Sequence, residues 1–151
     1  MDRLMALAVS SGVLIALWLK VGAMVGLAVP TGMVAWACFF AAGGKTTGLQ
    51  KTIATTLSGV VWVWLAWALI GLTNLGSMTW IIIGVVAFFL VLQSKVAALS
   101  FIPGAYCGAA VTVWAVPTDP KAYVLVAVPL VAGALLGYLS EMGAGLIARK
   151  A

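Results

Sequence analysis

Long stretches without a charged residue are the feature that most limits how this chain can fold. Residues 4–19, 21–44, 52–94, 96–118 and 122–140 contain no Asp, Glu, Lys or Arg. A helix that crosses a bilayer needs roughly 17 to 25 mainly apolar residues, so the longest stretch has room for two crossings. The whole chain is only 7% charged, whereas soluble domains are about 25% charged. We therefore predict an integral membrane protein.

Glycine, proline and charged residues divide these stretches into six predicted transmembrane helices. We place the helices at residues 4–20, 29–43, 49–72, 79–94, 98–116 and 122–145. The predicted fold class is thus an all-α membrane protein, with one transmembrane domain over residues 1–151. The first helix is interpreted as retained rather than as a cleaved signal, because Asp2 disturbs a positive n-region and the apolar pattern continues after it.

Basic residues lie at the ends of the predicted helices and indicate how the chain is oriented. If the N-terminus is inside, the cytoplasmic ends carry Arg3, Lys45, Lys51, Lys95, Arg149 and Lys150, and the outer loops carry only Lys20 and Lys121. Cytoplasmic loops are enriched in Lys and Arg, so both termini are expected in the cytoplasm. Because the charges mark helix ends, we expect a lipid bilayer as partner and no nucleic acid.

The chain also resembles itself at an offset of about 72 to 74 residues. Gly12 corresponds to Gly84, and the Pro30 segment corresponds to the Pro103 segment. Repeats of about 1–74 and 75–151 would each hold three helices. An odd number of helices forces the second repeat to enter the membrane from the opposite side, which is the plan of inverted-repeat transporters. Chance similarity between apolar segments rich in Gly and Ala is the alternative.

Pro30 and Pro103 occupy corresponding positions, and a glycine follows each closely. Proline removes a backbone donor, so the second and fifth helices are expected to begin late or to be interrupted within the membrane. Interrupted segments in matching positions point to a binding site near the midplane. The alternative is two ordinary helix starts, because proline is favoured in a first helical turn.

Chemically reactive groups are scarce in this sequence. It contains no His, and its acids are Asp2, Asp119 and Glu141, all near predicted helix ends. Proton relays place ionisable groups within the membrane, so a proton-coupled carrier is disfavoured, whereas sodium coupling through carbonyl and hydroxyl oxygens stays open. No pairing of nucleophile and base and no metal-ligand cluster is evident, so we expect no enzyme, no metal and no cofactor. Cys38 and Cys107 are interpreted as small packing residues rather than as a disulfide.

Three segments resemble a known family. They are residues 35–44 (AWACFFAAGG), 57–62 (LSGVVW) and 99–105 (LSFIPGA). In their order and spacing the chain resembles the family of small bacterial inner-membrane proteins that includes YcdZ. The resemblance covers most of the chain. It implies a multi-span protein of the bacterial cytoplasmic membrane, and it transfers no functional residues.

The leading hypothesis for function is a passive channel or facilitator for a small neutral or weakly charged solute such as urea, a short amide, ammonia or a small acid. The predicted pore and substrate-binding residues are Pro30, Thr31, Phe39, Phe40, Ser58, Trp62, Ser100, Phe101, Pro103, Gly104 and Tyr106. Their aromatic members would form a constriction, and their hydroxyl and backbone groups would supply hydrogen bonds. The alternatives are a non-transporting scaffold or regulatory subunit, and a secondary transporter that uses sodium or exchange.

Pairs of glycines four residues apart occur at Gly22 and Gly26, Gly104 and Gly108, and Gly133 and Gly137. Such pairs let helix backbones approach closely within a membrane. Together with the shortness of several predicted helices, they lead us to expect a homo-oligomer.

Overall fold

Helices form almost all of the part of the chain that the computed structural model describes, residues 2–73 and 76–148. The α-helices are α1 (Arg3–Met24), α2 (Val29–Ala41), α3 (Lys45–Thr73), α4 (Thr79–Leu92), α5 (Ile102–Ala115) and α6 (Pro120–Ala148). Short 3-10 turns occur at η1 (Gly76–Met78), η2 (Gln93–Lys95) and η3 (Ala97–Leu99). These two described ranges contain no strand, so the predicted all-α class is confirmed.

The six predicted helices are all present, and their ends differ from the prediction by at most four residues. The largest differences, of four residues each, are at α1, which continues past Lys20 to Met24, at α3, which begins at Lys45 instead of residue 49, and at α5, which begins at Ile102 instead of residue 98. Residues 97–99 form the separate turn η3, and Pro103 becomes the second residue of α5. A proline fits the first turn of a helix but clashes with the carbonyl four residues earlier in its interior, which explains the late start.

Three of the helices, α1, α3 and α6, are long and apolar enough to cross a membrane, with 22, 29 and 29 residues. The apolar helices α2, α4 and α5 have only 13, 14 and 14 residues. At 1.5 Å per residue these three are roughly 20 Å long, against about 30 Å for a hydrocarbon core.

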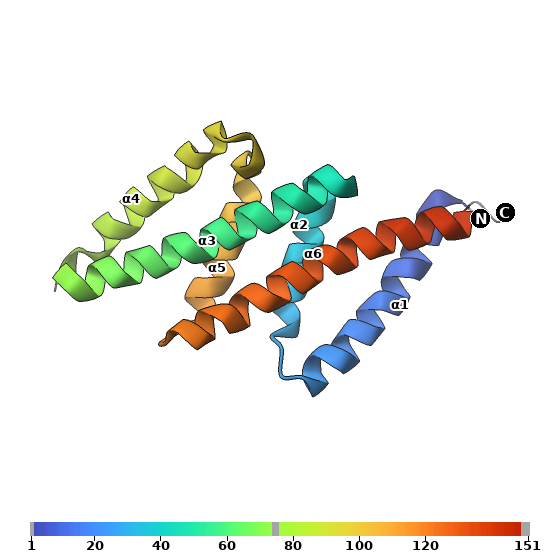
Figure 1. Cartoon of the computed structure of the whole chain (residues 1–151), viewed down its shortest axis with the longest axis horizontal. Helices are drawn as coiled ribbons and strands as arrows, with labels where there is room; N and C mark the ends of the chain where they lie inside the picture. Colours follow the sequence, from blue (N-terminus) through green and yellow to red (C-terminus); the bar gives the residue numbers. More distant parts are fainter. Residues whose placement is uncertain (1, 74–75, 149–151) are drawn as a thin grey trace.

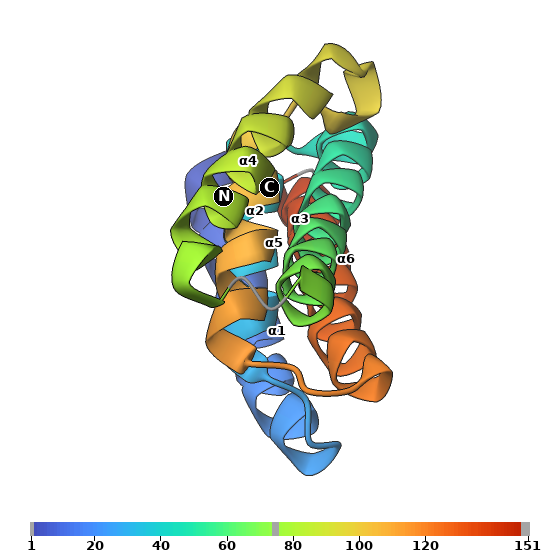
Figure 2. The same ribbon diagram turned by 90° about the vertical axis from the view of Figure 1, so that its left-hand side faces the viewer.

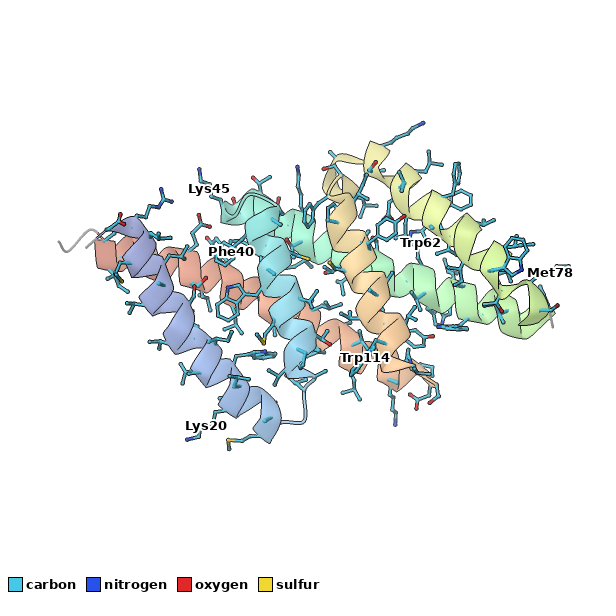
Figure 3. All side chains as sticks on the ribbon, turned by 180° about the vertical axis from the view of Figure 1, so that it is seen from behind. Lys20, Phe40, Lys45, Trp62, Met78 and Trp114 are labelled. Carbon is cyan, nitrogen blue, oxygen red and sulfur yellow. The ribbon has the colours of Figure 1, made fainter. Side chains whose placement is uncertain are left out.

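The helices are arranged in two layers, as Figure 2 shows: α3 and α6 form one layer, and α1, α2, α4 and α5 form the other. Figure 1 shows that α3 and α6 run in opposite directions along the molecule, and that α1 and α4 lie at its two ends. The labelled Lys45 and Lys20 lie on opposite sides of the molecule in Figure 3. The distribution of charge also predicts opposite sides of the membrane for these two residues.

Helix packing couples the first three helices to the last three. The most extensive contacts are between α2 and α6 and between α3 and α5, and the outer helices α1 and α4 pack on α6 and α3. Exchanging α1, α2 and α3 for α4, α5 and α6 converts each of these pairs into another pair of the same set. Each of these helices therefore packs mainly on a helix from the other half of the chain.

Glycines make the two central helix crossings very close. A Cβ atom on Gly133 of α6 would collide with the backbone oxygen of Gly32 in α2, and one on Gly59 of α3 would collide with the backbone of Ala105 in α5. Backbones can touch in this way only where side chains are absent. The glycine pair at Gly104 and Gly108 and the pair at Gly133 and Gly137 thus face crossings within the chain.

Replacing the glycines at these crossings should destabilise the protein. We expect Gly59→Ala and Gly133→Ala each to lower the free energy of unfolding by about 1 to 3 kcal/mol, because a methyl group must displace backbone on the facing helix. The measurement is unfolding in detergent micelles, followed by helicity.

The matched control is Gly84→Ala in α4, where a Cβ would meet nothing within 4 Å. This variant should be neutral or up to about 1 kcal/mol more stable, because alanine favours helices. Equal stability of the Gly84 and Gly133 variants would contradict the crossing geometry.

Candidate functional site

A row of hydroxyl side chains runs along one part of α3. Thr55 donates to the Lys51 carbonyl oxygen at 2.7 Å, Thr56 to the Thr52 carbonyl oxygen at 2.8 Å, and Ser58 to the Thr55 carbonyl oxygen at 2.7 Å. These bonds satisfy the hydroxyls within their own helix, which makes their burial in apolar surroundings tolerable. Thr52 is fully buried, as Thr55 and Thr56 are, but its hydroxyl has no hydrogen-bond partner within the described part of the chain.

An amide connects this row to the turn after α4. The Gln93 side chain donates from Nε2 to Ser58 Oγ at 3.1 Å and accepts at Oε1 from Trp62 Nε1 at 3.0 Å. The Trp62 indole also stacks on Phe89, with ring centroids 5.5 Å apart and an angle of 8° between the planes. We call Ser58, Trp62 and Gln93 the amide network.

Sequence analysis identified Ser58 and Trp62 but missed Gln93. Gln93 is the last residue but one of the charge-free stretch 52–94 and of the helix predicted at 79–94, and it is one of two glutamines in the chain. An uncharged amide beside an apolar helix was the available signal, since such a group must find partners in the protein.

The start of α5 packs against the same part of α3. Gly104 leaves room for the Thr55 hydroxyl and the Phe101 ring, where a Cβ would collide with both. Phe101 is half-buried, whereas Ser100, Pro103 and Tyr106 are exposed. Around α3 the structure therefore brings together predicted site residues from α3 and from the first turn of α5.

The predicted site residues of α2 lie elsewhere. Phe39 is fully buried at the crossing of α2 and α6, where its ring meets the Phe40 ring at 5.3 Å and the Tyr138 ring at 6.3 Å. Pro30 and Thr31 line a different cavity of about 360 Å³, between the start of α2 and the end of α5. Phe40, Trp62 and Trp114, labelled in Figure 3, mark these separate regions.

Pro30 and Pro103 are each the second residue of a helix, α2 and α5 respectively. Both helices are continuous after the proline. The interruptions thus lie before α2 and α5, in the segments that join them to α1 and α4, and not inside them. This corresponds to the alternative in which each proline starts a helix.

Two acidic side chains accept hydrogen bonds from backbone N–H groups at the starts of helices. The Glu141 carboxylate of α6 accepts a hydrogen bond from the Lys45 backbone N–H, the first residue of α3, at 2.7 Å. The turn before α3 requires this support, because Gly43, Gly44 and Lys45 all have positive φ angles, of 95°, 66° and 58°. On the opposite side, Asp119 accepts from the Ala122 N–H at 2.9 Å at the start of α6.

Neither a disulfide nor a metal cluster emerges from residues 2–73 and 76–148. Cys38 is buried, Cys107 is half-buried, and both are free thiols. No group of three or more His, Cys, Asp or Glu side chains in the same ranges could hold a metal ion.

Comparison with known proteins identifies relatives along the whole chain. The family model described as "Protein of unknown function (DUF1097)" matches residues 8–145. The chain is 34% identical to Inner membrane protein YcdZ of Escherichia coli K12, covering 100% of this chain and 92% of that protein. It is 31% identical to Inner membrane protein YcdZ of Salmonella typhimurium LT2, with 99% and 93% covered, and 34% identical to Uncharacterized protein YahC of Escherichia coli K12, with 72% and 73% covered. No solved structure matches the chain.

The amide network should show measurable coupling. In a double-mutant cycle of Gln93→Leu with Ser58→Ala, we expect a coupling energy of about 0.6 to 1.7 kcal/mol in the free energy of unfolding, the range of hydrogen bonds between membrane helices. The control cycle pairs Gln93→Leu with Thr112→Val, because the Thr112 hydroxyl bonds to the Gly108 carbonyl oxygen of its own helix at 2.7 Å. Coupling in the control as large as in the test cycle would argue against a specific network.

Proposed function

The chain belongs to the family described as Protein of unknown function (DUF1097), and from this membership we propose that it is a bacterial inner-membrane facilitator through which a small neutral or weakly charged solute passes passively. Solutes of this class are urea, short amides, ammonia and small acids. Each must exchange its hydrogen bonds with water for hydrogen bonds with protein while it crosses the apolar layer.

The observation that carries the proposal is the amide network of Ser58, Trp62 and Gln93. The Gln93 amide offers both a donor and an acceptor, as do urea and short amides, and its partners Ser58 and Trp62 hold it in place. None of these three side chains carries a charge. The network can therefore replace water for a neutral solute, while an ion would find no opposite charge on it.

In this proposal the solute passes along the side of α3 that carries Ser58 and Trp62, next to the first turn of α5 and outside the closed crossing at Gly59. Phe101, Gly104 and Tyr106 would border this path from α5, and Ser100 and Pro103 would lie at its entrance. The remaining predicted residues, Pro30, Thr31, Phe39 and Phe40, would line the approach along α2. In this proposal the aromatic side chains contact the solute one after another along its path, and they do not form a single ring around it.

The proposal also includes an architecture of two inverted three-helix repeats, with all six helices within the membrane. Three features support it. The helix pairs exchange as a set, α3 and α6 have 29 residues each, and α2 and α5 each have proline as their second residue. In addition, the close contacts Gly59 to Ala105 and Gly133 to Gly32 correspond at offsets of 74 and 73 residues.

A non-transporting scaffold or regulatory subunit is the second candidate. The specific observation in its favour is the direct backbone contact at both central crossings, which fills the space between α2 and α6 and between α3 and α5. A solid bundle of this kind suits a subunit that holds a partner.

Solute flux into liposomes that contain the purified protein separates these two functions. We expect permeability to urea or acetamide to exceed that of empty liposomes, and Gln93→Leu to reduce this excess by about tenfold, the effect of roughly 1.4 kcal/mol of lost hydrogen bonding. Thr112→Val is the control and should retain the flux.

Permeability equal to that of empty liposomes for every solute would contradict the facilitator function and favour the scaffold function. We further propose a homo-oligomer, in which neighbouring copies surround the short helices; a single copy found by mass measurement in lipid nanodiscs would contradict this part.

The proposed topology can be tested by labelling introduced cysteines in a variant without Cys38 and Cys107. With both termini in the cytoplasm, Cys placed at Lys20 or Lys121 should react with a membrane-impermeant maleimide in intact cells. Cys at Lys45 or Lys95 should react only after permeabilisation. Reaction of the Lys45 and Lys121 positions from the same side would be incompatible with inverted repeats.

A further inference from the structure

The outer helix α1 leaves an open groove beside α2. It packs mainly on α6, and its contacts with α2 are few. The groove has a volume of about 290 Å³ and is apolar, bordered by Gly12 and Ile15 of α1 and by Trp36 and Phe40 of α2. A Cβ on Gly12 would meet nothing within 4 Å, so glycine here keeps the groove open and serves no helix contact in the chain.

A second cavity continues this groove at the end where α1 begins. It has a volume of about 210 Å³, and we call it the polar cavity because the charged side chains of Arg3 and Glu141 border it, together with apolar residues such as Leu7. Phe40 borders both cavities, so the apolar groove and the polar cavity meet at its ring. In Figure 3, Phe40 lies near Lys45, toward the side of the molecule where this helix end is found.

The dimensions of the combined site match one leaflet of a bilayer. Arg3 and Ile15 are twelve residues apart on α1, a distance of about 18 Å along the helix. Half of a hydrocarbon core is about 15 Å thick. An occupant with a charged head at Arg3 would thus extend an apolar tail to the middle of the membrane.

The two charges define the head. Arg3 carries a guanidinium, which binds phosphate with two parallel hydrogen bonds. Glu141 uses Oε2 for the Lys45 N–H, and among the described residues its other oxygen has no hydrogen-bond partner, so it can accept from a cationic donor. A head with both a phosphate and an ammonium that donates hydrogen bonds satisfies this pair of charges.

We propose that the cavity of Arg3 and Glu141, with the groove between α1 and α2, is a binding site for a phospholipid with a primary-amine, zwitterionic headgroup, phosphatidylethanolamine. The phosphate binds Arg3, the ammonium binds Glu141, and one acyl chain lies along Gly12 toward Ile15. A choline headgroup has no N–H to donate, and a glycerol headgroup has no positive charge. This inference depends on the membrane setting of the chain and is independent of the proposed transport.

The test is binding of added lipid to the delipidated full-length protein in detergent micelles, measured by native mass spectrometry. Phosphatidylethanolamine, phosphatidylcholine and phosphatidylglycerol with identical acyl chains are compared. We expect phosphatidylethanolamine to bind about tenfold more tightly than the other two, the effect of one charge-assisted hydrogen bond.

Two variants assign this preference to the site. Glu141→Gln keeps an acceptor for the Lys45 N–H but removes the charge, so it should abolish the preference over phosphatidylcholine. Gly12→Leu fills the groove and should reduce binding of all three lipids. Gly84→Leu in α4 is its matched control, because Gly84 also has nothing within 4 Å of its Cβ position and lies on the opposite outer helix.

Equal binding of the three lipids, or tighter binding of phosphatidylglycerol, would overturn the proposal. So would a loss of binding in Gly84→Leu as large as that in Gly12→Leu, because lipid would then cover the protein without a specific site. Helicity and thermal unfolding of each variant confirm that the compared proteins are folded.

Discussion

The need to satisfy backbone polar groups without water controls this structure. In hydrocarbon, an unpaired N–H or C=O costs several kcal/mol, so the chain has to form helices whose hydrogen bonds close within each segment. The hydroxyls of Thr55, Thr56 and Ser58 in α3 obey the same rule by bonding to carbonyls one turn earlier. Once backbone and hydroxyls are satisfied locally, helices associate through close contact, and the glycines at the two central crossings permit that contact.

The positions of the helices could be predicted because they depend on local composition. Clusters of glycine, proline and charged residues mark where apolar helices end, and each predicted helix was found, although α1 continues past Lys20. The start of α5 was placed too early, since residues 97–99 are apolar and resemble a helix in composition. Only the steric demand of Pro103 on the preceding turn separates η3 from α5.

The candidate site was harder to predict because it depends on which helices meet. Ser58 and Trp62 were identified from their residue types, whereas their shared partner Gln93 comes from the end of another helix, 35 and 31 residues away respectively. The glycine pairs show the same limit: four residues between glycines indicate a close helix face but not the partner. Gly104, Gly108, Gly133 and Gly137 face helices of the same chain, where the pattern had suggested contact between copies.

The carboxylate of Glu141 that supports the start of α3 is 96 residues away from it in the sequence. During translation, α3 is synthesised long before this carboxylate emerges from the ribosome, and the left-handed turn at Gly43, Gly44 and Lys45 has no such support until then. The last helix therefore completes the first half. A ribosome that stops before α6 would release a chain in which α2 lacks the helix that Gly32 contacts, while the crossing of α3 with α5 could already form.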